Sequence, residues 1–192
     1  MSRPLRIQYP GALYHVMNRG TARQPTFTND RDYQAFLDTV AEAFRLWGIE
    51  VFAYSLMGNH YHLCLRTPKG NLSRVMRHVD GIYTQRFNRR HGRDGPLFRG
   101  RYRAILVDAD EYLAAVVRYI HLNPVRAAMV KRPSEWQWSG HGEYLGKEKR
   151  GLIDSRPVMG EFRIVARYEA FIREGAKVNY RAEWHPGDGR RF

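Results

Sequence analysis

The sequence has very little cysteine and no long hydrophobic run. Its single cysteine, Cys64, cannot form a disulfide within the chain and is typical of a protein from a reducing compartment. No apolar stretch approaches the roughly 20 residues that a membrane helix needs, and residues 1–9 have no apolar segment of the kind that marks a secretory signal. We therefore expect a cytoplasmic protein without a membrane partner.

Acidic residues are also few. The 192-residue chain has 19 Asp and Glu residues against 32 Lys and Arg residues, which gives a formal net charge of +13. Only 5 of those 32 residues are lysines, and arginine is the side chain whose planar fork binds a phosphate through two hydrogen bonds. The excess of basic over acidic residues produces a positive field over much of the surface and indicates a polyanionic partner.

Proline and glycine are too few and too scattered for a low-complexity chain, whereas hydrophobic residues make up 43% of the sequence. The length is about that of one domain. We predict a compact domain over residues 1–130, a C-terminal extension over 131–178 that packs on it and is a second candidate surface for the polyanion, and a flexible tail over 179–192.

The apolar residues change period along the chain, from two in strands to 3.6 in helices. We predict strands over 12–17, 49–57, 60–66 and 101–107, and helices over 32–47, 72–87, 108–123 and 162–173. Gly58-Asn59 is typical of a hairpin turn, Asp108 with Glu111 resembles a capping box, and Pro124 should end the third helix. The order β-α-β-β-α-β-α predicts an α+β fold with a ferredoxin-like core, a mainly antiparallel sheet, an added tyrosine-bearing helix and a basic tail.

Two histidines follow the predicted hairpin turn. Residues two apart in a strand share a face, so His60 and His62 should point the same way, while Tyr61 points into the opposite layer. Two imidazoles that converge on one point can bind a metal ion. The spacing by itself also fits two ordinary histidines on a half-exposed strand.

A tyrosine and an asparagine lie four residues apart on the predicted third helix. Tyr119 and Asn123 are therefore neighbours on one helix face and can act together. Alternatively, Tyr119 is a core aromatic and Asn123 caps the helix before Pro124. Tyr83 is the other tyrosine considered for a chemical role, and we assign it to packing. His121 points to another helix face than Tyr119 and Asn123, so we expect it to be structural or to face DNA.

Arginines concentrate in the second half of the predicted core. Nine of them lie between residues 74 and 103, interleaved with aromatic residues. Arginines pair with phosphates and aromatics stack on unpaired bases, which is the usual combination for single-stranded nucleic acid, although a solvated basic helix face would explain some of them. The candidate DNA-binding residues are Arg19, Arg86, Arg89, Arg90, Arg93, Arg99, Arg101, Arg103 and Arg126.

Taken together, these motifs closely resemble those of the REP-associated tyrosine transposases, relatives of the single-tyrosine HUH transposases of IS200-like insertion sequences. The likeness rests on the His60-Tyr61-His62 strand and on the helix that ends in Tyr119-Ile-His-Leu-Asn123-Pro-Val-Arg126. It extends over about residues 9–145 and includes 14–20, 97–102 and Trp138-Ser139. The residue between the two histidines is usually plainly hydrophobic in the family, and here it is Tyr61.

The resemblance implies roles for four residues. Tyr119 would be the nucleophile of a single-stranded DNA endonuclease and strand transferase, and His60, His62 and Asn123 would bind a divalent metal ion, Mg²⁺ or Mn²⁺. The insertion-sequence branch commonly has Gln where this chain has Asn123. The implied substrate is a hairpin-forming repeat beside a short recognised tetranucleotide, cut through a 5′-phosphotyrosine intermediate.

Two other functions fit the same sequence. The chain could bind DNA hairpins as a regulator without cleaving them, or it could be a metal-dependent hydrolytic nuclease in which Tyr119 only packs. Related enzymes differ in whether the tyrosine helix serves its own subunit or a partner's, so both a monomer and a homodimer stay open.

Overall fold

A computed structural model describes residues 7–107, 112–148 and 150–176. Its centre is a four-stranded sheet made of β1 (Ala12–Arg19), β2 (Glu50–Met57), β3 (His60–Thr67) and β4 (Arg103–Val107). The strand order is β2-β3-β1-β4, and each neighbouring pair is antiparallel. This is the order of a split β-α-β-β-α-β unit, so the predicted ferredoxin-like α+β core is confirmed.

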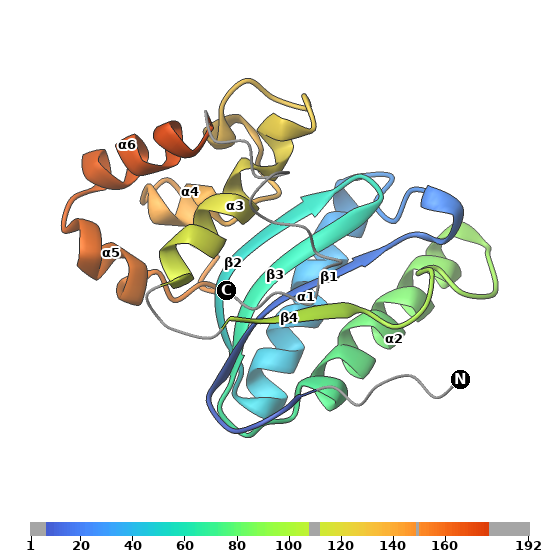
Figure 1. Cartoon of the computed structure of the whole chain (residues 1–192). Coiled ribbons are helices and arrows are strands. Elements are labelled where there is room, and N and C mark those ends of the chain that lie inside the picture. The colour runs from blue at the N-terminus through green and yellow to red at the C-terminus, as the bar shows by residue number, and fades with distance from the viewer. Residues whose placement is uncertain (1–6, 108–111, 149, 177–192) are drawn as a thin grey trace.

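Helices cover both faces of the sheet. α1 (Asp30–Trp47) and α2 (Leu72–His91) lie side by side on one face, and α3 (Leu113–Arg126) lies on the other together with α4 (His141–Tyr144), α5 (Arg156–Phe162) and α6 (Val165–Gly175) (Figure 1). Two short 3-10 turns, η1 (Thr21–Arg23) and η3 (Pro133–Glu135), complete the described elements. The sheet therefore separates two apolar layers.

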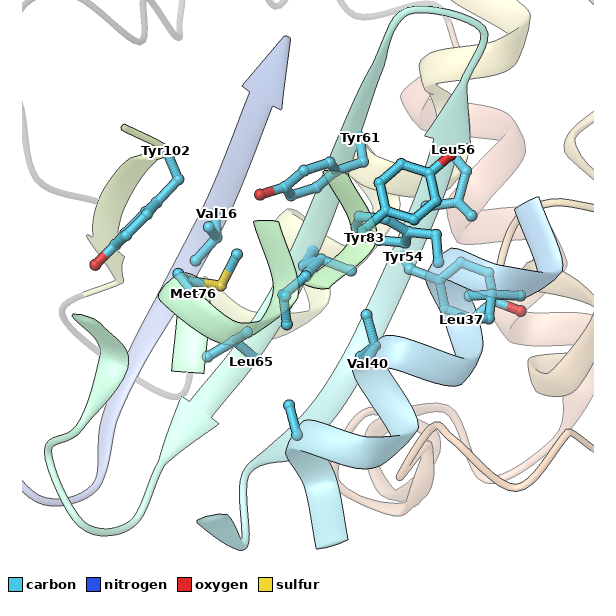
Figure 2. Packing of buried hydrophobic residues seen from close by; sticks show 14 of the residues in the cluster. Val16, Leu37, Val40, Tyr54, Leu56, Tyr61, Leu65, Met76, Tyr83 and Tyr102 are labelled. Carbon is cyan, nitrogen blue, oxygen red and sulfur yellow. The ribbon is translucent and has the colours of Figure 1, made fainter. Parts of the chain in front are cut away.

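The side chains of β3 divide between these two layers. Tyr61, Leu63 and Leu65 are buried in the layer beneath α1 and α2, where Figure 2 shows Tyr61 and Leu65 on the same side of the sheet as Met76 and Tyr83 of α2. Cys64 belongs to the layer under α3. The period-two alternation thus places His60 and His62 on one face, opposite Tyr61, as predicted, and this face is the one that α3 covers.

A buried carboxylate ties α1 to the end of α2. The side chain of Asp32 is fully buried and accepts hydrogen bonds from Thr28 Oγ1 at 2.6 Å, Arg90 Nη1 at 2.6 Å and His91 Nε2 at 2.9 Å. Burial alone would raise the pKa of Asp32, but the hydrogen bonds from Thr28, His91 and Arg90 lower it to about 2. The ionised carboxylate therefore stabilises the packing of the two helices.

The predicted end of the third helix was wrong. α3 continues through Pro124 to Arg126, because Leu122 and Pro124 are buried against the core and this packing outweighs the backbone preference before proline. As a result Asn123 lies within the helix and does not cap it. β4 begins at Arg103, two residues later than predicted, and the proposed capping pair Asp108 and Glu111 lies outside the described residues.

Residues after α3 complete the fold along the free edge of β2. Leu56 N donates to Trp138 O at 2.9 Å, and Gly140 N donates to Tyr54 O at 3.0 Å. The C-terminal helix predicted over 162–173 corresponds to α6, which begins at Val165. α5, which ends just before Arg163, where φ is 62°, was not predicted from the sequence. The predicted tail, 179–192, lies outside the described residues.

Among the helices described, none combines the length and the apolar character that crossing a membrane requires.

Candidate active site

A pocket of about 490 Å³ opens between β1, β3, the loop before β4 and α3. All four residues predicted to carry the chemistry line it, namely His60, His62, Tyr119 and Asn123. The other lining residues are Met17, Asn18, Arg19, Arg99, Gly100, Arg101 and Arg103. Side chains as far apart in the sequence as Met17 and Asn123 thus meet in one cavity.

The two histidines share a face of β3, and each has one ring nitrogen occupied. His60 Nδ1 lies 2.7 Å from Asn59 Oδ1, and His62 Nδ1 lies 2.9 Å from His15 Nε2. Within the described part of the chain, no hydrogen bond involves the Nε2 atom of either residue. In the tautomer that has its proton on Nδ1, each imidazole would offer an Nε2 lone pair to a metal ion, the arrangement usual for metal-binding histidines.

Both histidines are neutral at neutral pH. Burial lowers the pKa of His60 to about 4, with a further contribution from the charge of Arg19. Burial also holds the pKa of His62 well below its ordinary value, and the neighbouring His15, His60 and Arg19 add to the effect. The neutral imidazole is the form that binds metals.

Tyr119 projects from α3 beside His62. The ring centroids of these two residues are 6.0 Å apart and nearly perpendicular, at 85°. Burial raises the pKa of the Tyr119 phenol, while the charge of Arg126 and a hydrogen bond with the Asn123 side chain oppose this rise. The phenol is therefore protonated at neutral pH and must lose its proton as it reacts.

Asn123 lies one helical turn after Tyr119. Its Nδ2 donates to the Tyr119 carbonyl oxygen at 2.9 Å, which orients the amide group. The Oδ1 atom then remains as the amide's candidate ligand. Within the residues described, no three His, Cys, Asp or Glu side chains are arranged to hold a metal ion.

The predicted arginines fall into two groups. Four of them line the pocket, and these are Arg19, Arg99, Arg101 and Arg103. Next to the pocket, the guanidinium carbon of Arg126 lies 5.0 Å from the centre of the Tyr119 ring. These five side chains place positive charge around the candidate nucleophile.

The structure does not bring the other four predicted arginines to the pocket. Arg86, Arg89 and Arg90 lie on α2, which covers the opposite face of the sheet. Arg86 pairs with Glu42 at 2.7 Å, Arg90 pairs with Asp32, and Arg93 donates to Gln24 Oε1 at 2.6 Å. Arg86 and Arg90 thus hold α2 to α1, a role that was not predicted for them from the sequence.

Sequence reasoning missed His15, a fully buried residue of β1 that contacts two pocket residues. Its ring centroid lies 5.1 Å from that of His62 and 5.6 Å from that of Tyr119. Burial lowers its pKa to about 3. The alternation of β1 could have placed His15 on the correct face, but its approach to His62 depends on how β1 pairs with β3.

The two residues set aside by the sequence reasoning are structural. Tyr83 is buried in the layer under α1 and α2 (Figure 2), and its hydroxyl donates to the Thr26 carbonyl oxygen. His121 is also buried, with Nδ1 2.7 Å from Tyr168 Oη of α6. Neither residue lines the pocket.

Comparison with known proteins supports a transposase relationship. A family model described as "Transposase IS200 like" matches residues 8–123. No curated protein matches the sequence. Among solved structures, the chain is similar to a REP-associated tyrosine transposase bound to a REP hairpin, with a TM-score of 0.65 and 20% identity over 81% of this chain and 90% of that chain.

A second solved structure, a crystal structure of a protein from Deinococcus radiodurans R1 described as a candidate transposase, has a TM-score of 0.44 and 19% identity over 62% of this chain and 95% of that chain. At these levels of identity the likeness to the REP-associated enzyme shows a shared fold.

Proposed function

Because the chain belongs to the IS200-like transposase family, we propose that it nicks and rejoins single-stranded DNA through a covalent bond to Tyr119. The observation that carries this proposal is the pocket itself, where the tyrosine lies beside two histidines, an asparagine and four arginines. One cavity thus offers a nucleophile, a set of metal ligands and positive charge for a phosphate.

The ligand set fits a hard divalent cation. We propose that His60 Nε2, His62 Nε2 and Asn123 Oδ1 hold Mg²⁺ or Mn²⁺. These three ligands leave positions of an octahedral ion for phosphate oxygens and water, and Mn²⁺ accepts imidazole more readily than Mg²⁺ does. When bound, the ion would neutralise the charge of the scissile phosphate and orient it.

In the proposed reaction, Tyr119 Oη attacks the scissile phosphorus in line with the leaving 3′ oxygen. One P–O bond forms to the tyrosine and the P–O3′ bond breaks, while the phenol proton leaves to solvent and the 3′ oxygen takes up a proton. The products are a 5′-phosphotyrosine and a free 3′-OH. Because one phosphodiester replaces another, a 3′-OH can later reverse the step and rejoin DNA without ATP.

The pocket arginines would hold the strand on either side of this phosphate. Arg101 and Arg103 line the same pocket as the histidines, and the positive charge of Arg126 beside the phenol favours the phenolate that develops during attack. Tyr119 of α3 lies beside His62 of β3 within one chain, which supports a site assembled within one molecule. A second copy is not needed to supply the nucleophile.

We propose DNA hairpins as the substrate class. The similar solved enzyme is described as bound to a REP hairpin, and Asn123 matches the REP-associated branch, where insertion-sequence enzymes commonly have Gln. Residues 131–178, the proposed extension, would pack on the catalytic domain of residues 1–130.

The test is to trap the covalent adduct. Purified protein is incubated with Mn²⁺ and labelled single-stranded hairpins taken from repeats beside its gene, then run on a denaturing protein gel. We expect a labelled protein band that is absent from Tyr119→Phe and retained in the matched control Tyr112→Phe, whose exposed ring does not line the pocket.

Two outcomes would contradict the proposal. Hairpin binding without any adduct would favour a regulator that does not cleave. Cleavage by Tyr119→Phe at the rate of the unmodified protein would favour a hydrolytic nuclease.

A further inference from the structure

We propose that His15 is a positioning residue for the metal site: it accepts a hydrogen bond from His62 Nδ1–H and so holds His62 in the tautomer whose Nε2 can bind the ion. This inference rests on the proposed function, because it assigns His15 a role towards the metal ligand His62. His15 itself would neither bind the metal nor touch the DNA.

The pairing of β1 with β3 brings the two imidazoles together. In this register His15 is opposite Cys64, and Met17 is opposite His62, so His15 and His62 are diagonal neighbours on one face of the sheet. Their nitrogens, His15 Nε2 and His62 Nδ1, are 2.9 Å apart, a normal hydrogen-bond distance. The two residues, His15 and His62, are 0% and 5% exposed.

This one hydrogen bond links the tautomers of both residues. A neutral imidazole has a proton on one nitrogen and a lone pair on the other. When His62 carries its proton on Nδ1, it donates to His15 Nε2 and keeps a lone pair on Nε2. In the opposite arrangement His15 Nε2 donates, and His62 has its proton on Nε2, where it would block a metal ion.

His15 holds His62 in a way that water cannot replace. His60 has an equivalent partner in Asn59 Oδ1, but that pair lies at the hairpin turn, where both side chains are partly exposed and water can take the place of the amide oxygen. His15 is fully buried, and its ring lies close to those of both His62 and Tyr119. Loss of its acceptor would leave His62 Nδ1 without a partner in the layer under α3.

The first measurement is Mn²⁺ binding by titration calorimetry in the absence of DNA. The test variant is His15→Leu, which keeps much of the buried volume but has no acceptor, and the matched control is Asn59→Ala. We expect His15→Leu to bind Mn²⁺ about 10- to 100-fold more weakly, as is typical when the partner of a metal-binding histidine is removed. Asn59→Ala should stay within about threefold, because water replaces its oxygen.

The second measurement is the tautomer of His62, read from the imidazole ¹⁵N shifts of the metal-free protein. We expect a proton on Nδ1 in the unmodified protein and in His15→Gln, whose amide oxygen can accept, and a loss of this single tautomer in His15→Leu. A purely structural role for His15 would lower stability without changing the protonation of His62.

The outcomes separate this inference from the proposed function. His15→Leu that folds and binds Mn²⁺ within threefold of the unmodified protein would overturn the inference. A proton on His62 Nε2 in the unmodified protein would also overturn it, and this measurement does not depend on whether any variant folds. If variants that lack the His60 or His62 imidazole bind Mn²⁺ as tightly as the unmodified protein does, the proposed metal site itself fails.

Discussion

The pocket arginines should govern how DNA affinity depends on salt, and the arginines of α2 should not. The perturbation is Arg103→Gln, which removes one charge from the pocket, compared with Arg89→Gln, which removes one charge from the exposed surface of α2. Neither substitution breaks an ion pair among the described residues. The two variants therefore carry the same net charge and differ in where the charge is lost.

The expected size follows from counterion release. On single strands each neutralised phosphate contributes about 0.7 to the slope of log affinity against log salt concentration. If the four arginines that line the pocket each neutralise one phosphate, they account for a slope of about −3 and for a roughly 50-fold loss of affinity between about 50 and 200 mM salt. Arg103→Gln should make the slope shallower by about 0.7, and Arg89→Gln should leave it unchanged.

The assay is fluorescence anisotropy with a labelled single-stranded hairpin, titrated at several KCl concentrations. Both substitutions are made in the Tyr119→Phe background, so that binding is measured without cleavage. Equal changes of slope in the two variants would refute the reasoning, because the charge would then act through the field of the whole molecule and not through contacts at the pocket. An unchanged slope in Arg103→Gln would remove this residue from the DNA path.

Three further predictions concern stability and the ligand set. Asp32→Ala should lower the free energy of unfolding at pH 7 by about 2–3 kcal/mol, because buried hydrogen bonds to a charged group are lost. Hydrogen bonding overcomes burial and lowers the pKa of Asp32 from 3.8 to about 2, so the stability that the carboxylate provides is present above about pH 4 and falls as the pH drops towards 2. Urea unfolding should detect this decline in the unmodified protein and a smaller one in the variant. Gly20→Ala should lower the free energy of unfolding by about 1–3 kcal/mol in the same assay, because the new Cβ would lie 2.2 Å from a backbone oxygen. Gly81→Ala, on the open surface of α2, should instead raise the free energy of unfolding, by at most about 1 kcal/mol. Equal effects of the two substitutions would contradict the packing argument. Asn123→Ala should slow adduct formation about 30-fold, corresponding to roughly 2 kcal/mol for the lost ligand oxygen, while Asn123→Gln retains most of the rate; an unaffected Asn123→Ala would exclude this residue as a ligand.

Local periodicity was sufficient to predict the order of the core elements from β1 to α3, and the faces of the strand that carries the histidines. Strand alternation places His60 and His62 together whatever the sheet around them, and helical spacing places Asn123 beside Tyr119 in the same way. The motifs then pointed to the family, which the match over residues 8–123 shows. These inferences needed only residues close together in the chain, whose geometry the backbone fixes.

Only the tertiary structure decided which distant side chains join them. The strand register brings His15 to His62, the side of the sheet separates the pocket arginines from those of α2, and burial of Pro124 extends α3 beyond its predicted end. The same local pattern of charged or polar residues is compatible with either face of the sheet and with several registers of strand pairing. What selects among them is the burial of apolar surface and the pairing of buried polar groups across the whole fold, which no local window of sequence contains.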